Sequence, residues 1–253
     1  MKMLNGIKIL SGELRAALLI AGKDISIYYA KPPVLMWSVA LPFFLFFSWS
    51  VGRSIPLELQ IAPMVAVAVF FGASSIGPVI IPWERRAGTY ERLLTAPVSL
   101  LAILIGKGLA GTFFGVVVAI VAILFGWFMG VPVTNWAATL LAVALSSGVF
   151  SALGILFSSI ATQDVAAVMM PSTLVRWPLL FVSGILIPFE SMPKVGRWLG
   201  LCSPLTYTAD AVRHGIQGAG IFPFEVDCMV LVGFWLLLLG GSIALHKRGL
   251  SNA

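Results

Sequence analysis

Six long apolar runs constrain this chain more strongly than any other feature of its sequence. They cover residues 34–51, 59–81, 108–129, 136–160, 165–188 and 228–245. An α-helix rises about 1.5 Å per residue, so about 20 apolar residues cross the hydrocarbon core of a bilayer. The runs are apolar on every face rather than alternating, which argues against membrane-spanning strands. We therefore predict an all-α membrane protein with six transmembrane helices in a single domain over residues 1–253.

The composition supports a membrane protein and argues against a separate soluble domain. Hydrophobic residues make up 59% of the 253 residues and charged residues only 10%, with a mean hydropathy of +1.02. A net charge of +6 could suggest nucleic acid, but basic residues gathered on one side of a membrane explain it more simply. Two cysteines are too few for a disulfide framework and lack metal-site spacing. We expect no nucleic-acid partner.

Lysine and arginine residues indicate the orientation in the membrane. If the N-terminus is cytoplasmic, the inner loops and termini hold 11 of them and the outer loops hold 4. Cytoplasmic segments are enriched in these residues, so both termini are predicted to lie in the cytoplasm. The inner residues are Lys2, Lys8, Arg15, Lys23, Lys31, Arg85, Arg86, Arg92, Lys107, Lys247 and Arg248, and the outer ones are Arg53, Lys194, Arg197 and Arg213.

The N-terminal segment before the first run is predicted to be an amphipathic helix on the inner membrane surface. Its apolar stretch is too short for a signal peptide and is closed by Lys23 and Asp24. Apolar residues at spacings of three and four indicate one membrane-facing side. They are Leu14, Leu18, Ala21, Ile25 and Tyr28.

Two segments between the runs carry unusual sequences. The segment from Pro82 to Lys107 is charged up to Arg92 and contains Gly88 and Pro97; its residues alone indicate a solvated helical loop. The segment 183–218 contains the helix breakers Pro188, Pro193 and Pro204 among apolar residues. This pattern favours short helices that dip into the outer membrane interface, rather than a loop that lies in water.

Both segments resemble those of the ABC-2 type integral-membrane subunits of ATP-binding-cassette exporters, and the resemblance covers essentially the whole chain. The first motif comprises Glu84, basic residues, Gly88, Thr89, Glu91, Leu93, Leu94, Pro97, Gly106 and Lys107. The second comprises Ser183, Gly184, Pro188, Met192, Pro193, Ser203 to Tyr207, Asp210, Ala211 and Arg213.

The resemblance implies that two permease subunits, expected here as a homodimer in the lipid of the plasma membrane, pair with two separate ATPase subunits. It implies a coupling helix from Glu84 to Leu94 that enters a cleft of the ATPase, an interfacial helix at residues 10–30, and re-entrant helices that close the outer end. The sequence contains no G-x-x-x-x-G-K-[ST] phosphate loop. ATP and magnesium are therefore expected on the partner, with no catalytic residue, cofactor or metal in this chain. The candidate coupling residues are Glu84, Arg85, Arg86, Gly88, Thr89, Glu91 and Arg92, and the candidate outer gate is Pro188, Pro193, Pro204 and Tyr207.

Arg176 lies near the middle of the fifth run, where a charged side chain is costly unless it faces protein or water. It either lines a substrate path or is satisfied structurally, and the sequence leaves both open. Phe43 and Phe47 of the first run either contact lipid or line the path, and Ser183 completes the candidate path residues. His214 and His246 show no metal-ligand spacing.

Two other functional classes are less consistent with the sequence. A self-contained secondary transporter or channel would place acidic residues inside the runs, and a membrane enzyme would place a nucleophile with its base there. The predicted function is the permease of an ATP-driven exporter, with the transporter or channel as the alternative. The cargo, whether a hydrophobic drug, a lipid or a glycan, stays open.

Overall fold

The structure, a computed structural model, describes residues 2–51, 55–160, 162–187 and 189–251, and these residues form helices joined by turns and loops, without strands. Side chains are described between residues 11 and 248, except at positions 33, 35, 37 and 190 and in the gaps. The all-α prediction is confirmed for these residues. The elements are α1 (Lys2–Asp24), a π-helical turn (Ile25–Tyr29), α2 (Pro32–Ser50), α3 (Leu57–Ser74), α4 (Gly77–Arg86), α5 (Thr89–Leu94), α6 (Leu100–Phe128), α7 (Trp136–Ser158), α8 (Val165–Val182), a 3-10 turn (Phe189–Ser191), α9 (Lys194–Leu201), α10 (Pro204–Gln217) and α11 (Phe224–Ser251).

Short polar residues begin several of these helices. Ser99 and Asn135 each accept a hydrogen bond of 3.1 Å from the third residue of the helix that follows. Asp164 caps α8 and Ser203 caps α10 in a similar way. Because the first amides of a helix have no partner within it, such caps define where the apolar helices start.

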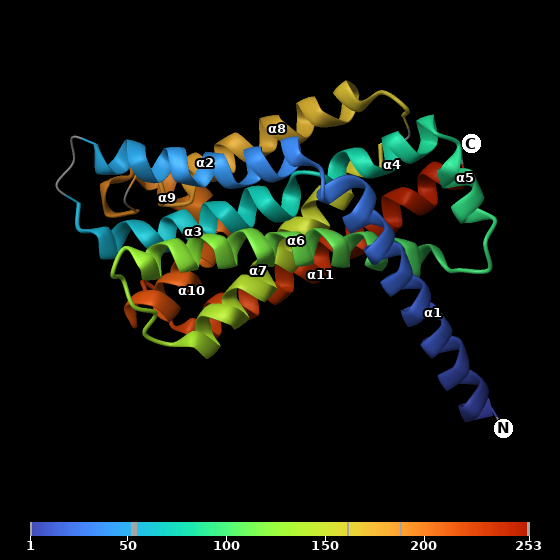
Figure 1. The fold of residues 1–253 in the computed structure, drawn as a ribbon, viewed down its shortest axis with the longest axis horizontal. Helices are drawn as coiled ribbons and strands as arrows, with labels where there is room; N and C mark the ends of the chain where they lie inside the picture. Colours follow the sequence, from blue (N-terminus) through green and yellow to red (C-terminus); the bar gives the residue numbers. More distant parts are fainter. Residues whose placement is uncertain (1, 52–54, 161, 188, 252–253) are drawn as a thin grey trace.

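The helices form an elongated bundle with α3 at its centre (Figure 1). In the most apolar stretch of α3 and α4, 89% of residues are buried, against 22% in α8 and 17% in α11. α6 packs closely on α3, since a Cβ added to Gly115 would lie 2.7 Å from the Ala73 Cβ. A glycine at this point therefore permits the close crossing.

The two ends of the bundle carry different elements (Figure 1). α4, α5 and the last part of α11 lie at one end, which we call the α5 end, and α1 projects away from it. α9 and α10 lie at the opposite end, which we call the α10 end. The predicted coupling segment and the predicted outer segment are therefore separated by the length of the bundle.

Five helical stretches in the described residues are long and apolar enough to cross a membrane: Leu57–Arg86, Leu100–Phe128, Trp136–Ser158, Val165–Val182 and Phe224–Arg248. The first predicted run corresponds to α2, where Ser38–Ser50 is apolar but shorter. Six membrane crossings therefore remain a prediction.

The observed helix bounds differ from the predicted runs in four places. The predicted run 59–81 breaks after Ser74, and α4 restarts at Gly77 with Pro78 in its first turn, because proline cannot donate the next helical hydrogen bond. α6 begins at Leu100 rather than at residue 108, so it includes Lys107. α8 ends at Val182, before Gly184, whose φ of 82° is a left-handed conformation that commonly ends a helix. α11 begins at Phe224, before the predicted run, because the acidic residues of its first turn escape an apolar-run criterion.

Candidate functional site

The predicted coupling segment consists of two short helical pieces rather than one helix. Glu84 lies in the last turns of α4, and α5 follows after Gly88, which has a φ of 66°. This left-handed conformation strains residues with a side chain, so glycine suits the corner. The Thr89 hydroxyl donates to the Glu84 carbonyl oxygen at 3.2 Å and the Gly88 amide donates to that of Arg85 at 3.1 Å. These two hydrogen bonds therefore fix the direction in which α5 leaves α4.

Burial divides the residues of this segment into two groups. Glu84 and Tyr90 are 1% and 2% exposed. The remaining predicted coupling residues lie on the surface, with Arg85 half-buried and Arg86, Gly88, Thr89, Glu91 and Arg92 exposed. The segment therefore offers a mixed-charge surface while two of its side chains are held inside the protein.

Tyr90 anchors α5 to the bundle. Its ring joins an apolar cluster with Ile81 of α4, Leu104 of α6 and Ile155 of α7. The Arg85 guanidinium carbon lies 5.1 Å from the centre of the ring, within range of a cation–π contact. Burial raises the pKa of the Tyr90 phenol, which stays neutral. The position of α5 is thus tied to the packing of three longer helices.

Glu84 belongs to a buried cluster of four charges that we call the ion cluster. Its Oε2 atom lies 2.6 Å from the Lys107 ammonium nitrogen of α6, which also lies 3.3 Å from Asp24 Oδ2 of α1. Lys23 pairs with the Glu84 Oε1 atom and lies 2.9 Å from Asp24 Oδ1. The side chains of Lys107, Glu84 and Asp24 are at most 1% exposed, and that of Lys23 is 38% exposed.

The charges of the ion cluster balance. Two carboxylates face two ammonium groups, so each buried charge has an opposite partner, as buried charges require. Burial alone would lower the pKa of Lys23, but hydrogen bonds and charge interactions with Glu84 and Asp24 outweigh it and raise the pKa. The Lys23 ammonium therefore stays charged at neutral pH. The cluster connects α1, α4 and α6 directly behind the coupling segment.

The ion cluster changes the interpretation of Glu84. The sequence motif predicts that Glu84 contacts an ATPase, whereas its carboxylate is used in internal ion pairs. Sequence analysis did not find Asp24 or Lys23 as partners, because they lie about 60 residues away from Glu84 in the chain. Lys107, at the edge of an apolar run, was the available signal for a buried cation.

The N-terminal helix packs on the bundle through a face that shares only Ala21 with the side predicted to contact the membrane. Ala17, Ile20 and Ala21 are buried, whereas Leu14 and Leu18 are 58% and 57% exposed. A Cβ on Gly106 would lie 2.6 Å from the Ala17 carbonyl oxygen, so α1 contacts α6 backbone to backbone. The predicted apolar face is therefore divided, because the protein covers one side of α1 and leaves leucines on another.

At the α10 end, a cavity of about 420 Å³ is lined by residues of α2, α3 and α10 and by the segment that follows α8. Ser183 lies on its wall, and its hydroxyl donates to the Leu180 carbonyl oxygen at 2.8 Å. The Tyr207 hydroxyl donates to the Leu201 carbonyl oxygen at 2.9 Å. Pro193 precedes α9 and Pro204 begins α10, while Pro188 lies outside the described residues. Pro193 and Pro204 thus mark the starts of the two short helices, and Tyr207 links α10 back to the last residue of α9.

A family model for the ABC-2 type transporter matches residues 16–216, which include both sequence motifs and the ion cluster. The chain belongs to the ABC-2 type transporter family. It is therefore a membrane permease component of an ABC transporter rather than an ATPase, and the family implies an ATP-binding-cassette partner. Membership also places the chain in a membrane, in agreement with its apolar helices.

Curated relatives of this ABC-2 permease come from a eukaryote and from bacteria. It is 29% identical to ABC transporter G family member 20 of Dictyostelium discoideum over 70% of this chain and 24% of that protein. It is 27% identical to Nodulation protein J of Rhizobium meliloti over 66% of this chain and 63% of that protein. Nodulation protein J of Rhizobium leguminosarum bv. viciae is 26% identical over 75% of this chain and 73% of that protein. The chain thus spans less than two thirds of the first two relatives.

The candidate path residues of the permease have separate neighbours. Arg176 is 6% exposed, and its guanidinium donates to the Ser172 hydroxyl, with an Nε to Oγ distance of 3.0 Å. Phe43 packs edge-on against Phe125 at 4.7 Å between ring centres, while Phe47 is 53% exposed. Ser183 lies at the cavity of the α10 end. Within the described part of one subunit, these residues form no common site.

Proposed function

We propose that this chain is the permease of an ATP-driven exporter and that the surface around α5 is where the separate ATPase subunit binds. The observation that carries the proposal is the division of the segment, with Glu84 and Tyr90 buried and Arg86, Glu91 and Arg92 exposed. Charged surface residues on a rigid support suit docking, because electrostatic complementarity sets both the rate and the orientation of association.

The ion cluster supplies the path by which a movement of the ATPase reaches the membrane helices. A push on α5 acts on α4 through the corner at Gly88, and Glu84 then transmits it to Lys107 in α6 and Asp24 in α1. Paired charges in a low-dielectric interior resist separation, so these helices move together rather than one by one. We therefore assign to Glu84 the role of transmitting the movement to the membrane helices, and to Arg86, Glu91 and Arg92 the role of contacting the ATPase.

A triple replacement tests the docking surface. We expect Arg86→Ala, Glu91→Ala and Arg92→Ala together to leave membrane insertion intact while reducing co-purification of the ATPase and transport-stimulated ATP turnover. Lys194→Ala with Glu225→Ala, both exposed near the α10 end, is the matched control. Unimpaired association and turnover in the triple variant would assign these charges to the solvated surface and refute the docking role.

We further propose a homodimer in the plasma membrane with both termini in the cytoplasm and the substrate path at the dimer interface. The support is the outward face of α8, where Met170, Leu174, Trp177 and Phe181 form an apolar stripe along a groove of about 880 Å³. A stripe at spacings of four, three and four suits packing against another helix. The cargo we propose is a hydrophobic drug, lipid or glycan, in keeping with the exposed aromatic residues of α2 and α8.

Disulfide cross-linking tests the dimer. In a background without Cys202 and Cys228, we expect Leu174→Cys to form a disulfide-linked dimer in membranes. Leu237→Cys on α11, which is 67% exposed, should stay monomeric. Equal cross-linking at both positions would indicate random collision and would remove α8 from the interface. External labelling of Lys194→Cys but not of Arg86→Cys would support the proposed orientation.

A further inference from the structure

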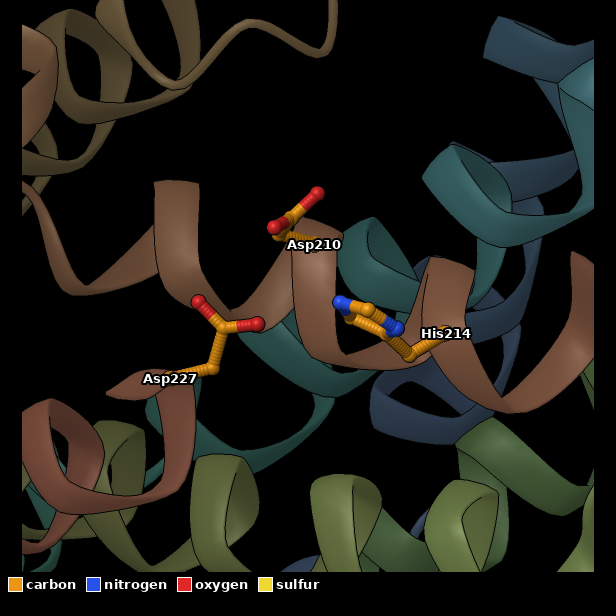
Figure 2. A group of neighbouring side chains, drawn as sticks. All are labelled: Asp210, His214 and Asp227. Atoms are coloured by element: carbon orange, nitrogen blue, oxygen red, sulfur yellow. The ribbon is translucent and has the colours of Figure 1, made fainter. Parts of the chain in front are cut away.

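Three potential metal ligands meet between α10 and α11. Asp210 and His214 lie one helical turn apart on α10, and Asp227 reaches toward them from the first turn of α11 (Figure 2). One ligand atom from each residue lies within 4.8 Å of the other two. The sequence showed no such group, because 12 residues and a chain reversal lie between His214 and Asp227.

Asp227 is the unusual member of this group. Its side chain is fully buried, and neither carboxylate oxygen has a hydrogen-bond partner among the described residues. A buried carboxylate without a partner is strongly unfavourable, so Asp227 requires a positive ligand or a proton. No buried acid of the ion cluster lacks an opposite charge, so this deficit is specific to the α10 end.

The Asp210 carboxylate accepts backbone hydrogen bonds but keeps lone pairs that can bind a ligand. Its carboxylate accepts from the Ile221 amide at 2.8 Å and the Phe222 amide at 2.7 Å, which fixes its position. The Arg213 guanidinium lies 3.6 Å from Oδ1 and offsets one of the two negative charges. A carboxylate accepts about four hydrogen bonds, so lone pairs remain on Asp210, and one net negative charge remains on the group.

The imidazole ring of His214 lies close to a backbone carbonyl oxygen. Its Nε2 atom lies 2.5 Å from the Phe222 carbonyl oxygen. A lone pair on Nε2 and one on the carbonyl oxygen would repel each other at this distance, so a proton or a cation must lie between the two atoms. With the proton on Nδ1 instead, Nε2 and the carbonyl oxygen both offer lone pairs to a cation near the carboxylates.

We propose that Asp210, His214 and Asp227 bind one divalent first-row metal ion, of which Zn²⁺ is the representative. Imidazole nitrogen and carboxylate oxygen are ligands that zinc accepts, and tetrahedral coordination would bring the ligand atoms to about 3.3 Å from one another. Because the observed ligand atoms lie within 4.8 Å of one another, each pair would have to approach by about 1.5 Å at most. The ion would join α10 to the start of α11 and would stabilise the wall of the cavity at the α10 end, to which Asp210 also belongs.

Metal binding to the full chain in lipid nanodiscs tests the proposal. After chelator treatment and tag removal, Zn²⁺ alone is titrated, and bound metal is measured by calorimetry and elemental analysis. Co²⁺ then replaces Zn²⁺ as a probe, because its visible absorption reports coordination. We expect one ion per chain, affinity at least about 100-fold weaker in Asp227→Asn and His214→Gln, and unchanged affinity in the control Glu225→Gln, an exposed acid in the same turn.

The outcomes separate a metal site from a protonated carboxyl group. Absence of saturable Zn²⁺ and Co²⁺ binding to the unmodified chain would overturn the proposal and leave a proton on Asp227. Saturable binding that survives in both variants would place the ion elsewhere and would also overturn it. If a variant fails to fold, the Co²⁺ spectrum of the unmodified chain, lost on chemical modification of histidine and protected by Zn²⁺, provides the decisive measurement.

Discussion

The two ends of the bundle solve the problem of buried charge differently. At the α5 end, Lys107 reaches the two buried acids Glu84 and Asp24, and Lys23 completes a neutral cluster. At the α10 end, Asp210 is held by backbone amides while Asp227 has no hydrogen-bond partner in the described chain. Every buried charge of the ion cluster is therefore paired within one subunit, whereas Asp227 at the α10 end lacks a partner among the described residues.

The contrast indicates which cluster transmits force and which one binds. A cluster with all charges paired stabilises one arrangement of its helices, because separating any pair leaves a buried charge behind. A cluster with an unmet charge gains free energy from whatever supplies the missing partner. We therefore expect mutations at the two ends to differ in sign as well as in size.

Lys107→Leu should have the largest effect. It leaves two buried carboxylates with only the half-exposed Lys23, so we expect the free energy of unfolding to fall by about 3–5 kcal/mol. Thermal unfolding in detergent micelles measures the loss. Arg92→Leu, an exposed cation on α5, is the control and should change stability by less than about 0.5 kcal/mol. Equal effects would mean that the ion cluster has no special role.

Asp24→Asn and Asp227→Asn should act in opposite directions. The first breaks an ion pair with Lys107, and we expect it to destabilise the fold by about 2–3 kcal/mol. The second removes a carboxylate without a partner, and with chelator present it should stabilise the fold by about 1 kcal/mol. Both are measured by thermal unfolding at neutral pH. Destabilisation by both variants would break the comparison between the two ends.

Ser172→Ala examines a third kind of buried charge. Arg176 is a buried cation with a neutral hydroxyl as its partner, and a hydrogen bond to a charged group contributes about 1.5–3 kcal/mol. We expect the free energy of unfolding to fall by about 1.5 kcal/mol, the lower end of this range, because the guanidinium keeps some access to water in the variant. Thr173→Ala, on the exposed side of the same turn, should be neutral. A neutral Ser172→Ala would show that Arg176 has another partner.

Apart from the control Arg92→Leu, Gly88→Ala should have the smallest destabilising effect at the α5 end. No atom lies within 4 Å of an added Cβ, so only the left-handed backbone conformation opposes the change, at about 1 kcal/mol. Gly12→Ala in α1 also meets no atom, but there the alanine favours the helix and should stabilise it slightly. Unfolding of both variants by denaturant provides the comparison. A stabilising Gly88→Ala would contradict the strained corner.

The sequence alone determined the helical nature of the chain and the locations of its two distinctive segments. The long apolar runs became helical, the run 59–81 as the two helices α3 and α4, and Pro193, Pro204 and Gly88 marked real helix ends. These features depend on local properties: the solvation of a run of side chains and the backbone freedom of single residues. They can be read from neighbouring residues without knowing what lies across the bundle.

Only the tertiary structure decided which charged groups meet. Glu84 pairs with Lys107, 23 residues later, and Lys107 with Asp24, 83 residues earlier. Likewise, Asp227 joins Asp210 and His214 because α11 starts beside α10. Such contacts depend on where two helices cross and how each is rotated about its axis. That rotation is set by packing over the whole helix, including the close approach of α1 to Gly106, and no local pattern encodes it.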